Sequence, residues 1–470
     1  MGGYVPAMEQ LASNLFHLTF PRHDALMEAE AVGWAQKTLV LNPGNWEIMV
    51  TLASFRHHGW GLPKDEKLAN EWEEKAMQAN GAKAALHLAF AHAHKSILAH
   101  DPDKILYFLN KAAESNNLTA QSFLGIYYAG EIFKGDPIPL DHELSRFWLE
   151  KAFHGGRRGA AAQLGKFYYY GKGGYPRDLV KAKHWLELSS ASDTKLARSE
   201  KYLLATLYWS GTPDMPPDKN KAMALFREAA EQGDAFAQFA LGQLYRGGFI
   251  DAKPDMAQAL SWYHRSAKSY ALAQTTLGLM YLRGEGVAAD PQQAVKLLRQ
   301  AAQAGETSAM YLSGILYQEG MGVKKDLQKA RAWFLLGAEA GEARAMVKLS
   351  LYLLDGKGGH QEFPLAAHWA RKAAEKNLDF GLCWAGTLWH FGVGIPSDTE
   401  QSKTWMRQSS AAGLATCNRV LTVESEPAQT PSTAAAIPSL VHAVANDLSA
   451  ALDATIQQPY PDVSLHLNVL

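Results

Sequence analysis

A Leu-Gly-x-x-Tyr-x-x-Gly pattern recurs along the chain, most clearly from Leu241 to Gly248 and from Leu277 to Gly284. Its leucine position, the anchor, recurs every 36 to 40 residues, at Leu52, Leu88, Leu124, Leu164, Leu204, Leu241, Leu277, Ser313, Leu349 and Ala385. A period of this length indicates a solenoid of stacked units, because a single unit is too small to bury its own apolar face. Since a solenoid offers a long surface, binding is the first function to expect.

A large residue follows each anchor after about twenty positions, and a small residue follows four positions later. The large residues are Trp72, Phe108, Trp148, Trp185, Leu225, Trp262, Leu297, Trp333, Trp369 and Trp405. A spacing of four places both members on one face of a helix. We therefore expect the large residue to fill the space between helices.

Glycine loops separate the two patterns, as in Gly59-Trp60-Gly61 and Gly284-Glu285-Gly286. An aspartate suited to starting a helix follows these loops, at Asp65, Asp290, Asp326 and Asp398. The second helix should end at Gly or Asn in the left-handed conformation, at Asn80, Asn116, Gly156, Gly233, Gly305, Gly341, Asn377 and Gly413. Each unit is thus predicted as helix A, which carries the anchor, a glycine loop, helix B and a tight turn.

These motifs resemble the Sel-1-like repeat family, which is related to the tetratricopeptide repeats. The stretches from Ala273 to Gly305 and from Asp326 to Gly341 follow the family pattern closely, and the resemblance covers residues 45–420. The repeat at Leu88 departs from it, with Lys95 in place of the loop glycine. The resemblance implies an all-α, α/α superhelical solenoid of about eleven helical pairs.

The sequence divides into a solenoid over residues 1–423, a linker over 424–437 and a C-terminal segment over 438–470. Residues 1–45 read as an atypical capping repeat, with helices expected from Ala7 to Phe20 and from Ala29 to Leu41. The linker is rich in Pro, Ser, Thr and Ala, which is typical of a connection between folded parts.

An amphipathic helix is predicted from Pro438 to Gln457. Its apolar face carries Val441, Val444, Leu448, Leu452 and Ile456. We expect this face to cover the exposed end of the solenoid near Trp405. Residues 463–469 then alternate between apolar and polar side chains, which predicts a strand free to join a partner's sheet.

Composition narrows the classes of partner. The formal net charge of −1 gives no reason to expect nucleic-acid binding. The amino-terminal residues lack the pattern of a secretory signal, and no apolar run is long enough to span a membrane, so a cytoplasmic location is expected. Cys383 and Cys417 lie on neighbouring repeats, but two cysteines fit a reducing compartment, and we expect unpaired thiols.

No constellation of residues predicts catalysis, a cofactor or a metal. The glycine loops follow a helix and recur with the repeat, whereas a phosphate-binding loop follows a strand. His87, His92, His94 and His100 cluster in the degenerate repeat, but His92 and His94 are two residues apart and diverge on a helix. We therefore expect a protein that is not an enzyme.

A stripe on helix A is the predicted partner site. Residues two before, two after and five after the anchor share a face expected to line the concave side, and we call them the helix A stripe. Its candidates for partner binding are Tyr169, Tyr202, Trp209, Phe239, Gln243, Arg246, Tyr311, Gln318 and His390. Aromatic residues and Arg are enriched at binding hot spots. Each ring could instead pack against a neighbouring helix, and the sequence leaves that choice open.

Three kinds of function remain open, and the resemblance supports the first two. The first is a non-catalytic scaffold or adaptor that binds another protein or peptide along the concave face. The second is an immunity protein that neutralises a secreted bacterial toxin, for example a lipase. The third is a regulator that holds a small ligand, or an enzyme. The sequence names no partner.

Overall fold

The computed structural model describes residues 25–93, 98, 100–132, 140–190, 198–249, 253–411, 420 and 431–454. These residues form helices joined by loops, with one isolated bridge between Thr212 and Met215. The A helices are α3 (Trp46–His58), α5 (Gly81–Ala93), α7 (Leu118–Tyr128), α9 (Gly159–Tyr170), α11 (Arg198–Ser210), α13 (Ala235–Arg246), α15 (Ala271–Arg283), α17 (Thr307–Glu319), α19 (Ala343–Asp355) and α21 (Asp379–Phe391). The all-α solenoid prediction is confirmed.

Each A helix is followed by its B helix. The B helices are α4 (Glu66–Ala79), α6 (Pro102–Glu114), α8 (His142–His154), α10 (Leu179–Ser190), α12 (Lys219–Glu231), α14 (Met256–Ser266), α16 (Pro291–Gln303), α18 (Leu327–Glu339), α20 (Phe363–Glu375) and α22 (Thr399–Ala411). Two further helices flank this array, α2 (Ala25–Leu41) and α24 (Pro431–Ala454). The expected helix from Ala7 to Phe20 lies outside the described residues.

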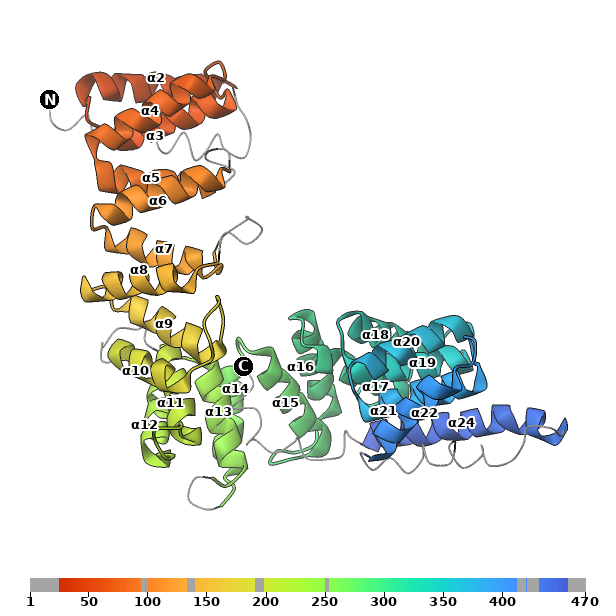
Figure 1. Cartoon of the computed structure of the whole chain (residues 1–470). Coiled ribbons are helices and arrows are strands. Elements are labelled where there is room, and N and C mark those ends of the chain that lie inside the picture. The colour runs from red at the N-terminus through yellow and green to blue at the C-terminus, as the bar shows by residue number, and fades with distance from the viewer. Residues whose placement is uncertain are drawn as a thin grey trace. The chain divides into compact units, whose positions relative to one another are not determined.

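The chain forms two compact units, residues 1–225 and residues 226–470, and the boundary falls inside α12. Within each unit, A and B helices alternate, and consecutive helices lie side by side (Figure 1). We call them unit 1 and unit 2 and describe each by itself.

Aspartates start the B helices as predicted. The carboxylate of Asp65 accepts a hydrogen bond from Leu68 N at 3.0 Å, and that of Asp326 accepts one from Lys329 N at 3.0 Å. Asp290 and Asp398 make the same contact three residues ahead. Such caps satisfy backbone N–H groups that have no partner inside the helix.

The glycine loops have a structural role. Gly392 ends α21 with φ of +66°, and Gly394 follows with φ of +74°. A Cβ on Gly394 would lie 2.1 Å from Phe363 O, at the start of the preceding helix B, so only glycine allows this approach. The helix B turns also follow the prediction at Asn116 and Asn377, with φ of +60° and +54°. Asn80 does not, because its φ is −155°.

At the predicted tryptophan positions of helix B, the buried residue lies one place later, whereas Phe108 and Leu297 are buried as predicted. Trp333 is only half-buried, whereas Phe334 is fully buried and packs its ring against Tyr352 at 5.1 Å. Trp405 and Met406 show the same relation. The tryptophans therefore lie at the edge of the interface between helices, and the following residue fills its centre.

Cys383 on α21 is fully buried and disulfide-bonded, so the expectation of an unpaired thiol is wrong for this residue. Cys417, the other cysteine of the sequence, lies outside the described residues. Disulfides are typical of oxidising compartments, so the reducing compartment that we expected loses its support. None of the described helices combines the length and apolar character that a membrane span requires.

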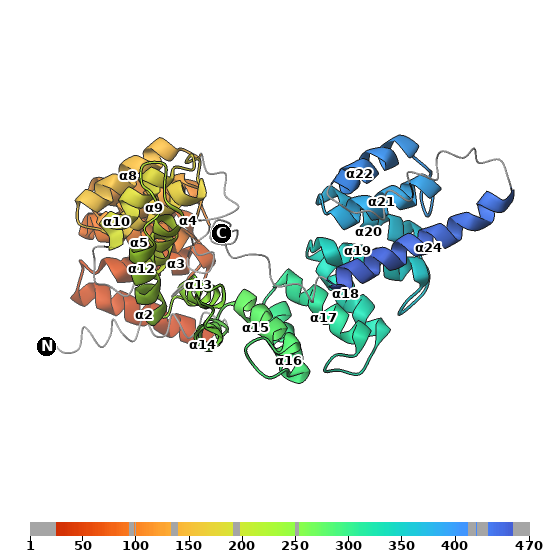
Figure 2. The ribbon, with the colours of Figure 1, turned by 90° about the horizontal axis from the view of Figure 1, so that it is seen from below.

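The carboxyl-terminal helix begins earlier than predicted. It starts at Pro431, within the segment expected to be a linker, and it is described up to Ala454. Both views place α24 alongside α19 and α21 of unit 2 (Figures 1 and 2). The alternating segment over residues 463–469 lies outside the described residues.

Candidate functional site

In unit 1, the helix A stripe is filled mainly by contacts between neighbouring repeats. Tyr169 on α9 is 7% exposed, and its hydroxyl lies 2.9 Å from Thr206 Oγ1 on α11. Lys166 on α9 pairs with the nearly buried Glu200 of α11 at 2.9 Å. Burial raises the pKa of Tyr169, which keeps its hydroxyl protonated.

Two other predicted residues of unit 1 lie on α11. Tyr202 is 8% exposed and belongs to the core. Trp209 is half-buried, and the ammonium group of Lys219 lies 3.8 Å from the centroid of its ring. Of the three predicted residues of unit 1, Trp209 is therefore the one with most surface available to a partner.

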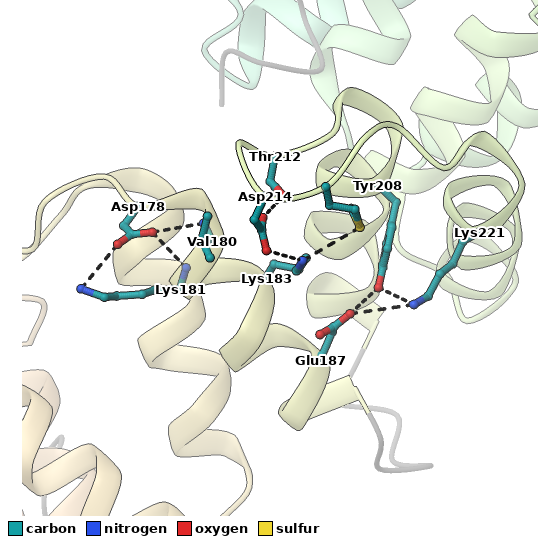
Figure 3. A network of polar contacts seen from close by, with 10 residues as sticks. Asp178, Val180, Lys181, Lys183, Glu187, Tyr208, Thr212, Asp214 and Lys221 are labelled. Atoms are coloured by element: carbon teal, nitrogen blue, oxygen red, sulfur yellow. Dashed lines mark hydrogen bonds and ion pairs between the residues drawn. The ribbon is translucent and has the colours of Figure 1, made fainter.

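A polar network joins α10 to α11, α12 and the loop between them (Figure 3). Lys183 on α10 donates to Asp214 of the loop at 2.9 Å. On the same side, Lys221 donates to the hydroxyl of Tyr208, which donates to the carboxylate of Glu187. These groups already satisfy one another, so the network ties successive repeats together.

Three predicted residues lie on α13 in unit 2 and are held by their neighbours. Phe239 is 6% exposed, with its ring 5.4 Å from Tyr263. Gln243 is 6% exposed. Arg246 makes a two-pronged ion pair with Glu285, at 2.6 and 2.9 Å. Arg246 therefore links the α13 repeat to the loop after α15, and its charge is already matched.

Further along unit 2, the apolar face of α24 packs against the solenoid. Val441, Val444, Ala445, Leu448 and Leu452 are each at most 4% exposed and belong to the same core cluster as buried residues of α17, α19 and α21. The predicted face of this helix is confirmed at its first four positions, and Ile456 lies outside the described residues. Full burial of one aliphatic side chain stabilises a fold by roughly 1.5–3 kcal/mol, so α24 is firmly held.

The polar contacts of α24 gather at its carboxyl-terminal end. Lys348 on α19 is completely buried, and its ammonium group lies 2.6 Å from Asp453 Oδ1 and 2.8 Å from Ser449 Oγ. Tyr311 on α17 donates to the backbone oxygen of Leu452 at 3.2 Å. These contacts fix the position of α24 along the A helices as well as its rotation.

Two further side chains complete this surface. Gln318 on α17 donates to Asp453 Oδ2 at 3.2 Å, and it accepts a hydrogen bond from the hydroxyl of Tyr352 at 3.0 Å. We call Tyr311, Gln318, Lys348 and Tyr352 the α24 seat. Nearer the middle of the helix, His442 lies 3.6 Å from Asp355 of α19.

Burial controls the ionisation of the α24 seat. It lowers the pKa of Lys348, and the nearby carboxylate of Asp453 opposes that shift. Burial also raises the pKa of Tyr352, so its hydroxyl remains a hydrogen-bond donor. The seat therefore presents one buried cation and neutral donors to an acceptor on the docked helix.

The structure thus brings two predicted residues together and gives them an occupant. Tyr311 and Gln318 both contact α24, whereas His390 on α21 is half-buried with its ring against Phe391 at 4.6 Å. The helix was expected to cover the end of the solenoid near Trp405, and the surface that it covers is larger than predicted. The helix lies against α21, as a cover near Trp405 would, but it also reaches α19 and α17.

Sequence reasoning missed Lys348, although a signal was present. The residue directly before the anchor is uncharged in the neighbouring repeats, where it is Thr276, Leu312 and Trp384. A lysine at this position of a core helix requires a negatively charged partner. Asp453, near the end of the predicted amphipathic helix, is the acidic residue that pairs with this lysine.

Two other candidate sites contain polar groups that already pair with neighbouring side chains. His92 is buried and lies 3.2 Å from Glu73, whose other oxygen accepts from Lys104 at 2.8 Å. No group of three possible metal ligands occurs in the described part of the chain. An open depression of about 600 Å³ is lined by the single loop Ser210–Pro217, and its Asp214 is already paired with Lys183.

Comparison with known proteins identifies relatives that match part of the sequence. Over 152 residues, the chain is 30% identical to chitin synthase regulatory factor 3 of Schizosaccharomyces pombe, a match covering 31% of this chain and 16% of that protein. Over 159 residues, it is 30% identical to the chitin synthase regulator SKT5 of Saccharomyces cerevisiae, covering 32% and 23%. The chain therefore spans less than a quarter of either relative.

Solved structures resemble the fold over a larger part of the chain. A protective antigen present in uropathogenic Escherichia coli strains, which displays an SLR fold, is 26% identical with a TM-score of 0.53, and the match covers 98% of both chains. A Sel1 repeat protein from Oxalobacter formigenes is 24% identical with a TM-score of 0.51, covering 71% of this chain and 93% of that one. The second likeness concerns the fold alone.

The Sel1 repeat pattern itself matches the chain nine times, at residues 50–80, 119–156, 159–193, 201–234, 235–269, 271–306, 307–342, 343–378 and 381–414. The gap between the first two matches contains the repeat at Leu88, whose sequence is degenerate although α5 and α6 still form a helical pair. The matches cover about two thirds of the sequence, and the chain belongs to the Sel1 repeat family.

Proposed function

We propose that the chain is a non-catalytic interaction scaffold whose helix A stripe binds a helical segment of a partner protein. The observation that carries this proposal is the docking of α24. An amphipathic helix, separated from the repeats by residues 412–430, is held on the A helices of unit 2 through both apolar and polar contacts. Placing an amphipathic helix on an apolar face is a common way for proteins to recognise peptides.

Two further observations support a binding role. The groups of the polar network in Figure 3 pair with one another, whereas catalytic groups converge on a bound substrate. Two relatives are named as regulators of an enzyme, which agrees with a chain that acts by binding another protein. The described part of unit 1 contains no counterpart of α24, so we place partner binding on its stripe.

Site-specific photo-crosslinking tests this proposal. A photoreactive amino acid would replace Trp209 on the stripe of unit 1, and the matched control would replace Phe147, which is 52% exposed on helix B of the α8 repeat. In the cells that produce the protein, we expect a discrete crosslinked partner from position 209 and none from position 147. Crosslinks from position 147 alone would move the interface to the B helices and contradict the proposal.

A quantitative form of the test uses the purified partner. Trp209→Ala should weaken binding by about tenfold, or about 1.4 kcal/mol, because a half-buried aromatic ring is typical of a binding hot spot. Circular dichroism should show unchanged helicity. Equal affinity of the variant and the wild type would exclude Trp209 from the interface.

A further inference from the structure

The α24 seat contains a buried cation whose described polar partners all come from α24. The ammonium group of Lys348 contacts the Asp453 carboxylate and both the hydroxyl and the backbone oxygen of Ser449. An ammonium group removed from water costs several kcal/mol unless an anion and hydrogen-bond acceptors compensate it. The seat is therefore complementary to a helix that carries a carboxylate.

Repeat packing alone does not require this charge. At the equivalent position of the adjacent repeats, Leu312 and Trp384 are buried and uncharged, and those helical pairs pack in the same way. Lys348 is thus explained by the helix that docks on it. The apolar residues of that helix are small or medium in size and follow the spacing i, i+3, i+4, i+7, i+11, from Val441 to Leu452.

We propose that the α24 seat is a receptor for one amphipathic helix with a carboxylate after its last apolar residue, and that α24 fills it until a partner helix of the same chemistry displaces it. This proposal rests on the proposed function and names the chemistry of the partner segment. The occupant to which we commit is an acidic amphipathic helix of another protein, because charge complementarity to Lys348 selects it over a neutral or basic helix.

The partner must compete with a helix of the same chain. Because α24 belongs to the chain that carries the seat, its docking is intramolecular and corresponds to a high effective concentration. A partner present at micromolar concentration must therefore bind the emptied seat far more tightly than α24 does. Weakening α24 by substitution should open the seat to helices added in solution.

The experiment uses the full chain with Leu448→Asp, which places a carboxylate on the apolar face of α24 and should release the helix. The probe is a fluorescently labelled synthetic peptide of residues 436–456 with the wild-type sequence. By fluorescence anisotropy, we expect the variant to bind the probe at least about tenfold more tightly than the wild type does. Val444→Asp is a second variant that should give the same result.

Two altered peptides test the chemistry of recognition. A peptide with Asp453→Asn should bind the Leu448→Asp chain at least about tenfold more weakly, because it leaves the Lys348 ammonium group without its anion. A host helix of Ala and Gln that carries only the side chains of Val441, Val444, Ala445, Leu448, Ser449, Leu452 and Asp453 should bind within about threefold of the probe, a difference below 1 kcal/mol.

Three results would overturn the proposal. The first is a folded Leu448→Asp chain that fails to bind the probe, and the second is equal binding of the wild-type peptide and the Asp453→Asn peptide. The third is a wild-type dimer in sedimentation that exchanges α24 between copies, since the occupant would then be a second copy. These results leave the crosslinks from position 209 untouched, so failure here is distinguishable from failure of the proposed function.

Discussion

Lysines of the A helices find their anions in two different ways in the two units. In unit 1, Lys166 pairs with Glu200 from the next A helix, so the cation and its anion both belong to the repeats. In unit 2, Lys348 pairs with Asp453 of α24, a helix outside the repeats. The same repeat architecture thus pairs a lysine within the repeats in one unit and with a separate helix in the other.

This difference shows which contacts belong to the solenoid and which belong to a ligand-like segment. Contacts between repeats recur at every repeat of the array, so the loss of one such contact destabilises mainly the neighbouring repeats. The contacts of α24 are made once, across three repeats, and are lost together if the helix leaves. Unit 2 should therefore respond to changes in α24, and unit 1 should not.

Removal of α24 should produce the largest difference in stability between the two units. A chain that ends at Thr430 loses the burial of Val441, Val444, Leu448 and Leu452 and leaves Lys348 without its carboxylate. After the entropy of ordering the helix is deducted, we expect a loss of roughly 5 kcal/mol confined to unit 2. Hydrogen exchange should show faster exchange in α17, α19 and α21, with unit 1 unchanged. Equal losses of protection in both units would contradict the comparison.

A core substitution should come next, and it tests the corrected position in helix B. Phe334→Ala should lower the stability of unit 2 by about 3–5 kcal/mol, as expected for a large side chain replaced in a packed core. The half-buried Trp333 is the matched control, and its change to Ala should cost about 1–2 kcal/mol, since less of its surface is buried. Urea unfolding of both variants measures the difference. A larger loss for Trp333→Ala would restore the position predicted from the sequence.

The ion pair should respond asymmetrically to the loss of either partner. Asp453→Asn leaves the ammonium group of Lys348 buried without an anion, and we expect a loss of about 2 kcal/mol, reduced by the partial exposure of Asp453. Lys348→Met removes the buried charge and should change the stability of unit 2 by less than about 1 kcal/mol. Asn446→Ala, at an exposed position of α24, is the control that should leave the stability of unit 2 unchanged. Equal losses for both partners would argue against a buried cation.

The smallest expected effect is a dependence on pH. Because burial lowers the pKa of Lys348 below its value in the unfolded chain, the unfolded state binds more protons between these two pKa values. The contribution of Lys348 to stability should therefore rise with pH across that interval, up to the unfolded value near 10.5. Chemical unfolding of the wild type and of Lys348→Met from pH 7 to 10 should show that the free energy of unfolding of the wild type rises relative to that of the variant. A constant difference would mean that the pKa of Lys348 is unchanged on folding.

Part of the candidate site could be read from the sequence. Tyr311 and Gln318 were predicted from their positions relative to the anchor, and both contact α24. Arg246 was chosen because arginine is common at hot spots, but its charge is matched by Glu285 from a later loop. A pattern based on position identifies the face on which a residue lies, and it does not reveal what the neighbouring repeat places opposite.

Local features were determined by the sequence alone. The period, the A and B helices, the aspartate caps and the glycine loops depend on interactions within a few residues or between adjacent repeats, and these recur at every step. The apolar face of α24 was also predictable, because it follows from helical spacing. The exact buried position in helix B was not, since one residue is only about 100° of helix rotation and either neighbour can face the core.

Only the tertiary structure decided where α24 docks and what Lys348 does. Asp453 lies 105 residues after Lys348, and no period in the sequence connects them. Their pairing depends on the burial of the lysine and on the fit of one helix across three repeats, which are properties of the packed chain. The sequence therefore specified a repeating surface and an amphipathic helix, and packing joined the two because burial of apolar area and of one charge required it.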